Sequence, residues 1–451
     1  MREVRIRDTL SGELKPLQPR RDGEVGIYAC GPTVYSRIHV GNARPFVIPA
    51  LLARFLAREG YRPTLVVNVT DINDKIYDAA REAGVGSAEH AAEMTRLYFE
   101  DTDRLGIGRP DAEPLASETL AEIVALIEAL IESGHAYESG GDVYFRVRSF
   151  DGYGKLSNRD PDDMDQGEEA GSDRLKQDPL DFALWKARKE GEDTAWPSPW
   201  GEGRPGWHIE CSAMAEKLLG VDFEIHSGGS DLVFPHHENE IAQTEAARGA
   251  PLARIWMHNG MVQADEQKMS KSIGNIFQLS EALDRFGAEV LLTYLSSGHY
   301  RQPLEFSEDA LRQATARLER VRNYLAELAA EGEEDPFVAE RRREFLDALA
   351  DDFNTPRAWA ALFELIAEGN RRPLAGAHAA LRELLPLLGL ESLLEPDAET
   401  VEPQAEQLLA EREQARKDRD FARADELRDR LADLGWTVRD TPEGARLMRS
   451  R

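Results

Sequence analysis

Residues 25–42 read Val-Gly-Ile-Tyr-Ala-Cys-Gly-Pro-Thr-Val-Tyr-Ser-Arg-Ile-His-Val-Gly-Asn, and this stretch indicates the fold. The apolar run 25–29 predicts a buried strand, and the apolar spacing over 46–58 predicts an amphipathic helix. A second β-branched run at 64–69 follows that helix. Strand, helix and strand in this order are typical of a parallel α/β sheet, in which nucleotides bind where a strand gives way to a helix start.

A second informative stretch is Lys-Met-Ser-Lys-Ser at residues 268–272, bounded by Gly260 and Gly274. A basic run of this kind, taken alone, is most often a solvated loop. Lysine ammonium groups can also offset charge that builds on departing phosphates. Because a predicted anion-binding helix start lies upstream, we favour a loop that closes over a polyphosphate.

Length and composition limit the number of domains and the classes of partner that the chain can have. A chain of 451 residues is expected to form two to four domains. A formal net charge of −28 argues against nucleic-acid binding through bulk charge, although a local basic face would suffice. No apolar run approaches the roughly 20 residues of a membrane span, and the charged N-terminus lacks the apolar core of a signal peptide. We therefore expect a cytoplasmic protein with no membrane partner.

The only two cysteines are Cys30 and Cys211, and a disulfide is not expected between them in the cytosol. His236 and Glu240 are four residues apart and would share one face of a helix. These four side chains could form a tetrahedral S, S, N, O set for Zn²⁺. Spacing alone favours a structural role for each of them, because metal-site patterns are normally paired and close in sequence.

The remaining patterns predict an insertion and a helical second half. Further elements predicted from periodicity are helices at 87–105 and 117–133, a strand at 142–147, a polar loop at 157–177, and strands at 221–227 and 254–260. After about residue 303 we expect helices at 310–330, 337–352 and 355–375, an acidic linker at 396–403, and one last helix at 405–434.

Residues 30–35 with 39–42, together with 268–272, resemble the HIGH and KMSKS motifs of class I aminoacyl-tRNA synthetases. The closer resemblance is to the cysteinyl-tRNA synthetases, in which Asn replaces the second His of the first motif. Gly-Trp-His-Ile-Glu-Cys-Ser at 206–212, Phe-Pro-His-His-Glu-Asn-Glu at 234–240 and Trp-Met-His-Asn-Gly at 256–260 support it. The resemblance runs from about residue 9 to the C-terminus.

This resemblance implies an α/β class I Rossmann-type nucleotide-binding domain with a connective-peptide insertion. An all-α helical bundle and a small C-terminal anticodon-binding segment would follow. The implied boundaries are 1–114 and 206–303 for the two halves of the catalytic domain, 115–205 for the insertion, 304–395 for the bundle and 404–451 for the anticodon-binding segment.

The implied activity is ATP-dependent activation of L-cysteine, followed by its transfer to the 3′ end of tRNA(Cys). By resemblance, a monomer would carry one Zn²⁺, with Mg²⁺ arriving on ATP. The implied site residues are His39, Asn42, Lys268 and Lys271 for catalysis; Gly31, Thr33, His39, Gly41, Asn42 and Lys271 for ATP; Trp207, His226 and Asp231 for cysteine; and Cys30, Cys211, His236 and Glu240 for the metal.

A zinc site would have a clear physical purpose here. Serine and cysteine differ by one atom, and pocket shape separates such pairs by only about 1–3 kcal/mol. A cation that binds thiolate far better than alkoxide supplies the missing selectivity. An editing domain is then not required.

One departure concerns the C-terminus, where Leu447 stands at the position of an expected Trp after Asp440–Gly444. If that Trp stacks on an anticodon base, about 1–3 kcal/mol would be lost or supplied elsewhere, and Trp436 is a candidate. Two alternatives stay open. The first is a ligase that transfers the cysteinyl adenylate to a small amino-sugar, which the helical tail disfavours. The second is a binding-only relative, which intact His39, Lys268 and Lys271 disfavour.

Overall fold

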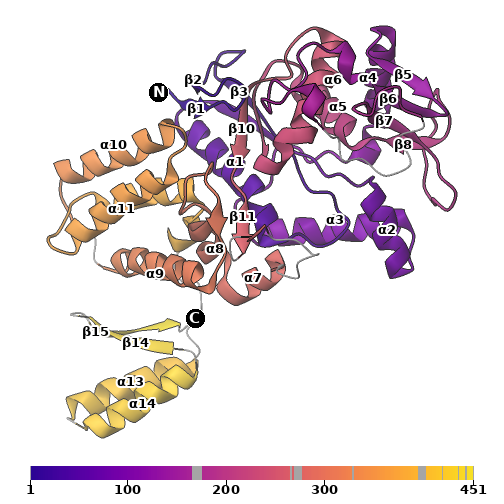
Figure 1. Cartoon of the computed structure of the whole chain (residues 1–451). Coiled ribbons are helices and arrows are strands. Elements are labelled where there is room, and N and C mark those ends of the chain that lie inside the picture. Colours follow the sequence, from indigo (N-terminus) through magenta and orange to yellow (C-terminus); the bar gives the residue numbers. More distant parts are fainter. Residues whose placement is uncertain are drawn as a thin grey trace. The chain divides into compact units, whose positions relative to one another are not determined.

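The computed structural model describes residues 2–164, 175–264, 267–268, 277–327, 330–394, 403–418, 420–434, 436–441 and 444–449. The chain forms two compact units, Met1–Leu394 and Glu395–Arg451 (Figure 1). Within the described ranges no helix is long and apolar enough to cross a membrane.

A four-stranded sheet in the order β10–β9–β3–β4 is the centre of the first unit, and every neighbouring pair in it is parallel. Its strands are β3 (Glu24–Ala29), β4 (Arg62–Val67), β9 (Phe223–Gly229) and β10 (Ala253–Asn259). Helix α1 (Val40–Arg58) connects β3 to β4 and buries Val47, Leu51 and Phe55, which recur every four residues. The predicted strand–helix–strand unit and its parallel sheet are confirmed.

A second sheet is formed by residues that lie, in the sequence, between the two halves of the first sheet. This is the part of the chain that we interpreted as an insertion. Its antiparallel strands are β5 (Ala136–Ser139), β6 (Asp142–Phe145), β7 (Phe182–Ala187) and β8 (Gly203–Pro205). Helix α4 (Leu120–Glu132) shares a hydrophobic cluster with Phe145, Phe182 and Trp185. Ile209 of α5 (Trp207–Leu219) belongs to the same cluster, so this sheet packs against the helix that carries Cys211.

The rest of the first unit is mostly helical, as predicted. Its helices are α2 (Asp74–Ala83), α3 (Ser87–Asp103), α6 (Glu238–Arg248), α7 (Leu279–Phe286), α8 (Ala288–Leu295), α9 (Glu308–Leu325), α10 (Pro336–Ala350), α11 (Thr355–Gly369) and α12 (Ala377–Leu384). Its short strands are β1 (Arg5–Arg7), β2 (Leu14–Pro16), β11 (Val262–Ala264), β12 (Gln267–Lys268) and β13 (Leu304–Glu305). Phe55 and Leu362 belong to one hydrophobic core, so the helices after residue 303 pack on the α/β sheet domain.

The second unit corrects one prediction. In place of one helix over 405–434, the chain forms α13 (Pro403–Lys417) and α14 (Phe421–Asp433). The helix is interrupted at Asp420. Its side chain accepts a hydrogen bond from the backbone N–H of Arg423 and caps the start of α14. Leu408 and Leu427 then bury their side chains in one cluster, which a single straight helix would not allow.

The C-terminal hairpin of the second unit consists of β14 (Trp436–Thr441) and β15 (Gly444–Arg449). Trp436 is only 4% exposed and packs in the cluster of α13 and α14, so the prediction that it could stack on an anticodon base is wrong for this conformation. The backbone of Leu447 pairs with Val438. The side chain of Leu447 and the predicted linker up to residue 402 lie outside the described part of the chain.

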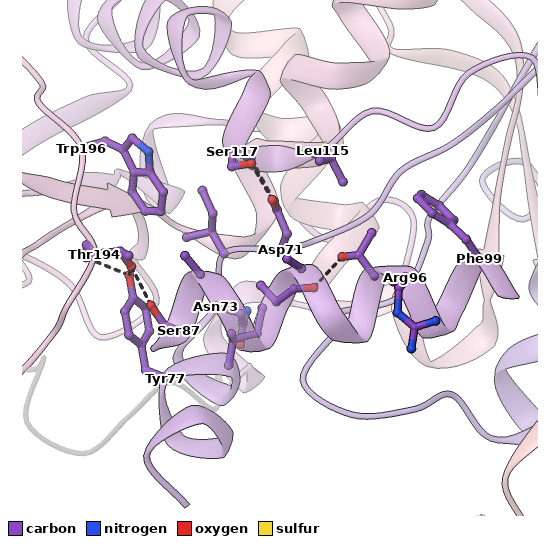
Figure 2. A pocket seen from close by; sticks show the side chains of 16 residues that line it. Asp71, Asn73, Tyr77, Ser87, Arg96, Phe99, Leu115, Ser117, Thr194 and Trp196 are labelled. Atoms are coloured by element: carbon purple, nitrogen blue, oxygen red, sulfur yellow. Dashed lines mark hydrogen bonds between the residues drawn. The ribbon is translucent and has the colours of Figure 1, made fainter. Parts of the chain in front are cut away.

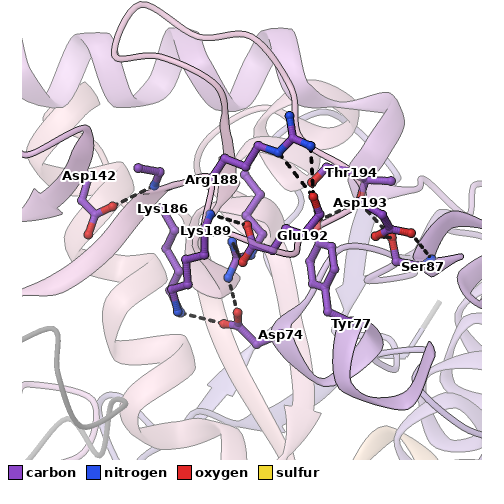
Figure 3. A network of polar contacts seen from close by, with 12 residues as sticks. Asp74, Tyr77, Ser87, Asp142, Lys186, Arg188, Lys189, Glu192, Asp193 and Thr194 are labelled. Carbon is purple, nitrogen blue, oxygen red and sulfur yellow. Dashed lines mark hydrogen bonds and ion pairs between the residues drawn. The ribbon is translucent and has the colours of Figure 1, made fainter. Parts of the chain in front are cut away.

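An ion-pair network around the buried Arg204 joins the insertion to helix α2 (Figure 3). Arg204 of β8 is 1% exposed and pairs with Asp74, the first residue of α2, and with Glu192 at 2.7 Å. Lys186 of β7 adds a 2.8 Å contact between its Nζ and Asp74. Asp74 is therefore shared by two cations of the insertion sheet.

Replacing Asp74 by alanine should destabilise the first unit. The variant leaves the buried Arg204 with Glu192 as its described carboxylate partner. Exposed pairs contribute at most about 1 kcal/mol, and breaking a fully buried pair costs about 3–5 kcal/mol. Because Asp74 keeps some solvent contact, we expect a loss of about 2 kcal/mol in the free energy of unfolding, measured by urea titration.

The matched control is Asp78→Ala on the same helix, since Asp78 pairs only at the surface with Arg81. Burial raises the pKa of Asp74, but Lys186 and Arg204 outweigh it, so the folded-state pKa lies below the ordinary 3.8. The stabilisation by Asp74 is therefore complete above about pH 4 and is lost as the pH falls further. Equal destabilisation by the two variants would contradict this account.

Candidate metal centre and nucleotide site

The start of α1 is organised by two residues of the predicted nucleotide motif. His39 is the extended residue before the helix, and Asn42 Oδ1 accepts a hydrogen bond from the His39 backbone N–H at 3.2 Å. A Cβ atom at Gly41 would lie 2.9 Å from the His39 ring. Only glycine therefore lets this ring fold over the first turn, where free helical N–H groups attract anions.

The end of β3 makes an equally close approach to the neighbouring chain segment. A Cβ atom at Gly31 would lie 1.6 Å from the Asn68 carbonyl oxygen, so no side chain fits there. The Gly31 N–H donates to Asn68 Oδ1 at 2.9 Å. Thr33 forms a parallel bridge with Thr70. The predicted ATP residues Gly31 and Thr33 are thus fixed by the segment that follows β4.

The described residues on the C-terminal side of the Lys-Met-Ser-Lys-Ser segment contact the same helix start. On its C-terminal side, Phe277 accepts at its carbonyl from Val40 N–H at 3.0 Å, and Leu279 N–H donates to Ile38 at 3.0 Å. On its N-terminal side, the backbone of Lys268 pairs with Gln263 in β12 and β11. Lys271 and the Lys268 side chain lie outside the described part of the structure.

The four predicted metal ligands come together although 210 positions separate the first from the last. One ligand atom from each of Cys30, Cys211, His236 and Glu240 lies within 4.8 Å of the others, and all four residues are buried. The two Sγ atoms are 3.9 Å apart. Glu240 Oε1 lies 3.5 Å from Cys30 Sγ and 3.1 Å from His236 Nε2. This arrangement is a buried candidate metal site.

A second, overlapping set shares Cys30 and Glu240 but uses His226 and His237. His226 Nε2 lies 2.8 Å from the other oxygen of Glu240, and His237 Nε2 lies 3.3 Å from Cys30 Sγ. His237 Nδ1 is engaged by His258 at 2.8 Å, which in turn contacts Thr9. Only the first set contains both thiols, which are the softer ligands preferred by Zn²⁺ and Cu⁺.

His208 supports the site in a way that sequence reasoning missed. Its Nδ1 lies 2.9 Å from His236 Nδ1, so the Nε2 of His236 is the nitrogen that faces Glu240. Burial lowers the pKa of His208 well below its ordinary value, so neutral His208 accepts the hydrogen bond. Such an outer contact fixes the orientation of a metal-binding imidazole. Its place in the 206–212 motif was the available signal.

The three residues predicted to bind cysteine lie in three different environments. The Trp207 ring stacks on His236 with centroids 4.4 Å apart and an exposed fraction of 37%, so it forms a wall beside the candidate metal site. His226 is fully buried between Glu240 and the Trp256 ring. Asp231 is exposed in a short helical turn directly after β9.

The charges of the site suit a cation. Burial raises the pKa of Glu240, but His226 and His236 outweigh it and hold that pKa well below its usual range. Glu240 and Cys211 raise the pKa of His236 to about 10 against the effect of burial. Contact with Cys30 lowers the pKa of Cys211 to about 6, while burial raises the pKa of Cys30. At neutral pH protonated His236 therefore faces a carboxylate and a thiolate, and these three groups together carry one net negative charge.

Comparison with known proteins identifies the class. Residues 16–316 match the family described as tRNA synthetases class I (C) catalytic domain. Residues 344–392 match the DALR domain, and residues 399–446 match the cysteinyl-tRNA ligase anticodon binding domain. The chain therefore combines a class I aminoacyl-tRNA synthetase catalytic domain with two further domains of that class.

Full-length relatives narrow this class to one family. The chain is 47% identical over 462 residues to a cysteine–tRNA ligase of Halorhodospira halophila, covering 99% of this chain and 100% of the relative. It is 43% identical over 464 residues to one of Caldicellulosiruptor saccharolyticus, with the same coverage. The chain belongs to the cysteine–tRNA ligase family of the class I aminoacyl-tRNA synthetases.

Solved structures agree with this fold. A Mycobacterium tuberculosis methionyl-tRNA synthetase bound by methionyl-adenylate aligns with a TM-score of 0.62 at 16% identity, covering 90% of this chain and 96% of that one. A leucyl-tRNA synthetase of Agrobacterium radiobacter in a ternary complex aligns with a TM-score of 0.60 at 12% identity, covering 85% and 86%. At these identities the likeness concerns the fold alone.

Metal binding at the candidate site should release protons. Metal-bound thiols are deprotonated and a metal-bound imidazole is neutral, but His236 and Cys30 are protonated at neutral pH. The affinity for Zn²⁺ should therefore rise with pH between about 6 and 9. Calorimetric titration in two buffers of different ionisation enthalpy measures the released protons, and an affinity that does not depend on pH would contradict the charge assignment.

Proposed function

We propose that this protein is a cysteine–tRNA ligase. It activates L-cysteine with ATP to cysteinyl adenylate and pyrophosphate, and then transfers cysteine to the 3′ end of tRNA(Cys). One observation carries the proposal: in a chain of this family, a buried site with two thiols lies at the end of β3, one residue before the Gly31 approach that begins the nucleotide motif.

Zn²⁺ is the metal that fits the residues best. Cys30, Cys211, His236 and Glu240 would hold one ion per chain, and two thiolates, an imidazole and a carboxylate are all common zinc ligands. When bound there, Zn²⁺ would attract the thiol of cysteine far more strongly than the hydroxyl of serine. Trp207, which stacks on His236, would form the wall against which the amino acid packs.

Adenylation requires positioning and charge stabilisation rather than a side-chain nucleophile. The cysteine carboxylate attacks the α-phosphate in line, and pyrophosphate leaves. We assign His39, Asn42 and the first N–H groups of α1 to the α-phosphate, and Gly31, Thr33 and Gly41 to close approach of the nucleotide. Lys268 and Lys271 would stabilise the leaving pyrophosphate, with Mg²⁺ brought by ATP.

Recognition of the amino-acid backbone is the second part of this proposal. The exposed carboxylate of Asp231 would pair with the substrate ammonium group, since it follows the carboxyl end of β9. His226 would act indirectly, because it is fully buried and hydrogen-bonds Glu240. Thus Asp231 would touch cysteine, and His226 would hold a metal ligand in place.

We propose a monomer with the segment roles that the sequence suggested. The catalytic halves would be residues 1–114 and 206–303, and the bundle at 304–395 and the segment at 404–451 would bind the tRNA. The comparisons give the amino-sugar alternative no support, since the matched relatives are cysteine–tRNA ligases over their full length. A protein that only binds tRNA or zinc would not need His39 at the start of α1, where Gly41 makes room for its ring.

The decisive experiment measures cysteine transfer to tRNA transcripts and cysteine-dependent pyrophosphate exchange in parallel. We expect exchange with cysteine but not serine, and charging confined to tRNA(Cys). Exchange without charging of any tRNA would instead indicate an enzyme that transfers cysteine to a small-molecule acceptor. The absence of both signals in folded, zinc-loaded protein would reject the ligase.

Glu240→Ala should remove the metal. The zinc content should fall from about one ion per chain to near zero, because the variant loses a ligand and also the charge that His226 and His236 face. The matched control is Glu245→Ala on the same helix, where the carboxylate pairs with Lys155 away from the cluster. Elemental analysis measures the zinc, and circular dichroism checks the fold. Retained zinc in Glu240→Ala would reject this ligand set.

His39→Ala should lower kcat/KM for pyrophosphate exchange by about 100-fold, because it removes one donor to the reacting phosphate. Zinc content should not change, since His39 is not a member of the candidate metal site. His135→Ala in the insertion is the control, because His135 hydrogen-bonds Ser149 there. Unchanged exchange in His39→Ala would exclude the assigned role.

A further inference from the structure

A cavity of about 500 Å³ lies beside the predicted nucleotide residues but belongs to none of the motifs discussed above (Figure 2). Its walls come from the loop after β4, from α2 and α3, and from the insertion. Its lining includes Asp71, Asn73, Tyr77, Arg96, Phe99 and Trp196. The volume falls within the range of small-ligand sites.

The cavity adjoins the nucleotide loop through the backbone. Thr70 donates its N–H to the Pro32 carbonyl at 3.0 Å and accepts from Val34 N–H at 3.1 Å. Asp71, the next residue, lines the cavity. A group that contacts Asp71 in the cavity would therefore lie next to Thr70, whose backbone is paired with the segment that contains Thr33.

The walls of the cavity are held by hydrogen bonds between separate elements. Asp71 accepts from the Ser117 N–H at 2.9 Å. Thr194 Oγ1 lies 2.8 Å from the Tyr77 hydroxyl and 3.0 Å from Ser87 Oγ, and Figure 2 shows these contacts at one side of the cavity. Asp193 accepts from Ser87 N–H at 2.7 Å (Figure 3). Hydrogen bonds therefore hold the walls of the cavity together, and these walls come from both α2–α3 and the insertion.

The lining favours a flat, neutral, aromatic group. Tyr77, Phe99 and Trp196 offer aromatic surface, and three alanines of α3 leave room beside it. The Ser117 hydroxyl donates to Asp71 and the Thr194 hydroxyl contacts Tyr77 and Ser87, but an oxygen in each can still accept a hydrogen bond from a polar edge. Arg96 is already paired with Glu93 at 2.8 Å and with Glu100 at 3.0 Å, so the cavity is poorly suited to a free phosphate.

We propose that this cavity receives an unpaired nucleobase from the 3′ end of the tRNA. The inference rests on the proposed function, because that function must bring a single-stranded 3′ end to the adenylate. Unpaired bases are typically recognised by stacking on aromatic side chains with hydrogen bonds to the base edge. Seating a base beside the loop of Thr33 would guide the terminal ribose toward the nucleotide site.

The test fills the cavity without changing any residue of the metal or nucleotide site. Ala92 is an exposed residue of α3 that lines the cavity, and Ala92→Phe places a ring in its mouth. We expect kcat/KM for tRNA charging to fall at least about 10-fold relative to cysteine-dependent pyrophosphate exchange, which corresponds to about 1.4 kcal/mol. Ala88→Phe, one turn earlier on the same wall, should act in the same direction.

The matched control is Ala83→Phe, the same change at an exposed position of α2 outside the lining, which should alter neither rate. A cytidylyl-cytidylyl-adenosine trinucleotide should inhibit charging by the unmodified protein and should lose potency against Ala92→Phe. Unchanged charging in both cavity variants, or a parallel loss of exchange and charging, would overturn the inference. Failure of the unmodified protein to exchange or charge would instead reject the proposed function.

Discussion

The contact between Gly31 and the Asn68 backbone is the constraint on which the site depends. The carbonyl oxygen of Asn68 occupies the space of a side chain at Gly31, so the end of β3 and the segment after β4 are in direct backbone contact. Cys30 precedes this contact and turns toward the candidate metal site, and His39 follows it at the start of α1. This single close approach lies between Cys30, in the candidate metal site, and His39, in the predicted nucleotide motif, which are nine residues apart in the sequence.

Electrostatics explain why the candidate metal site tolerates full burial. A buried carboxylate without partners would be protonated, since desolvation disfavours its charge. Glu240 instead contacts two imidazoles, one on each oxygen, and stays ionised. His236 is in turn oriented by His208 on its other nitrogen. The site is therefore organised before any ion binds, and the metal has only to displace protons.

Much of this could be predicted from sequence, for identifiable reasons. Local periodicity was sufficient for β3, α1 and the helices after residue 303, because short-range apolar spacing determines their buried faces. The gathering of Cys30, Cys211, His236 and Glu240 was predictable only by resemblance, since tertiary contacts bring them together over 210 positions. Family resemblance also predicted the C-terminal anticodon-binding segment, and residues 399–446 match that domain.

Other features could not be read from the sequence because they depend on what a residue meets in space. The break at Asp420 follows from a side-chain cap that competes with helix continuation, and the apolar spacing alone predicted one helix. Burial of Trp436 follows from that break, because α13 and α14 enclose it only after the chain reverses. His208 lies within the motif at 206–212, but only its contact with His236 reveals its supporting role.

The short connection between β8 and α5 has a practical consequence for protein engineering. One residue, Gly206, separates the last strand of the insertion from the helix that carries Trp207 and Cys211. The buried Arg204 also fastens that strand to α2. The insertion is therefore not an interchangeable module. A chimaera with a foreign insertion would need to keep β8, the start of α5 and the first turn of α2 together, because Trp207 and Cys211 would otherwise lose their support.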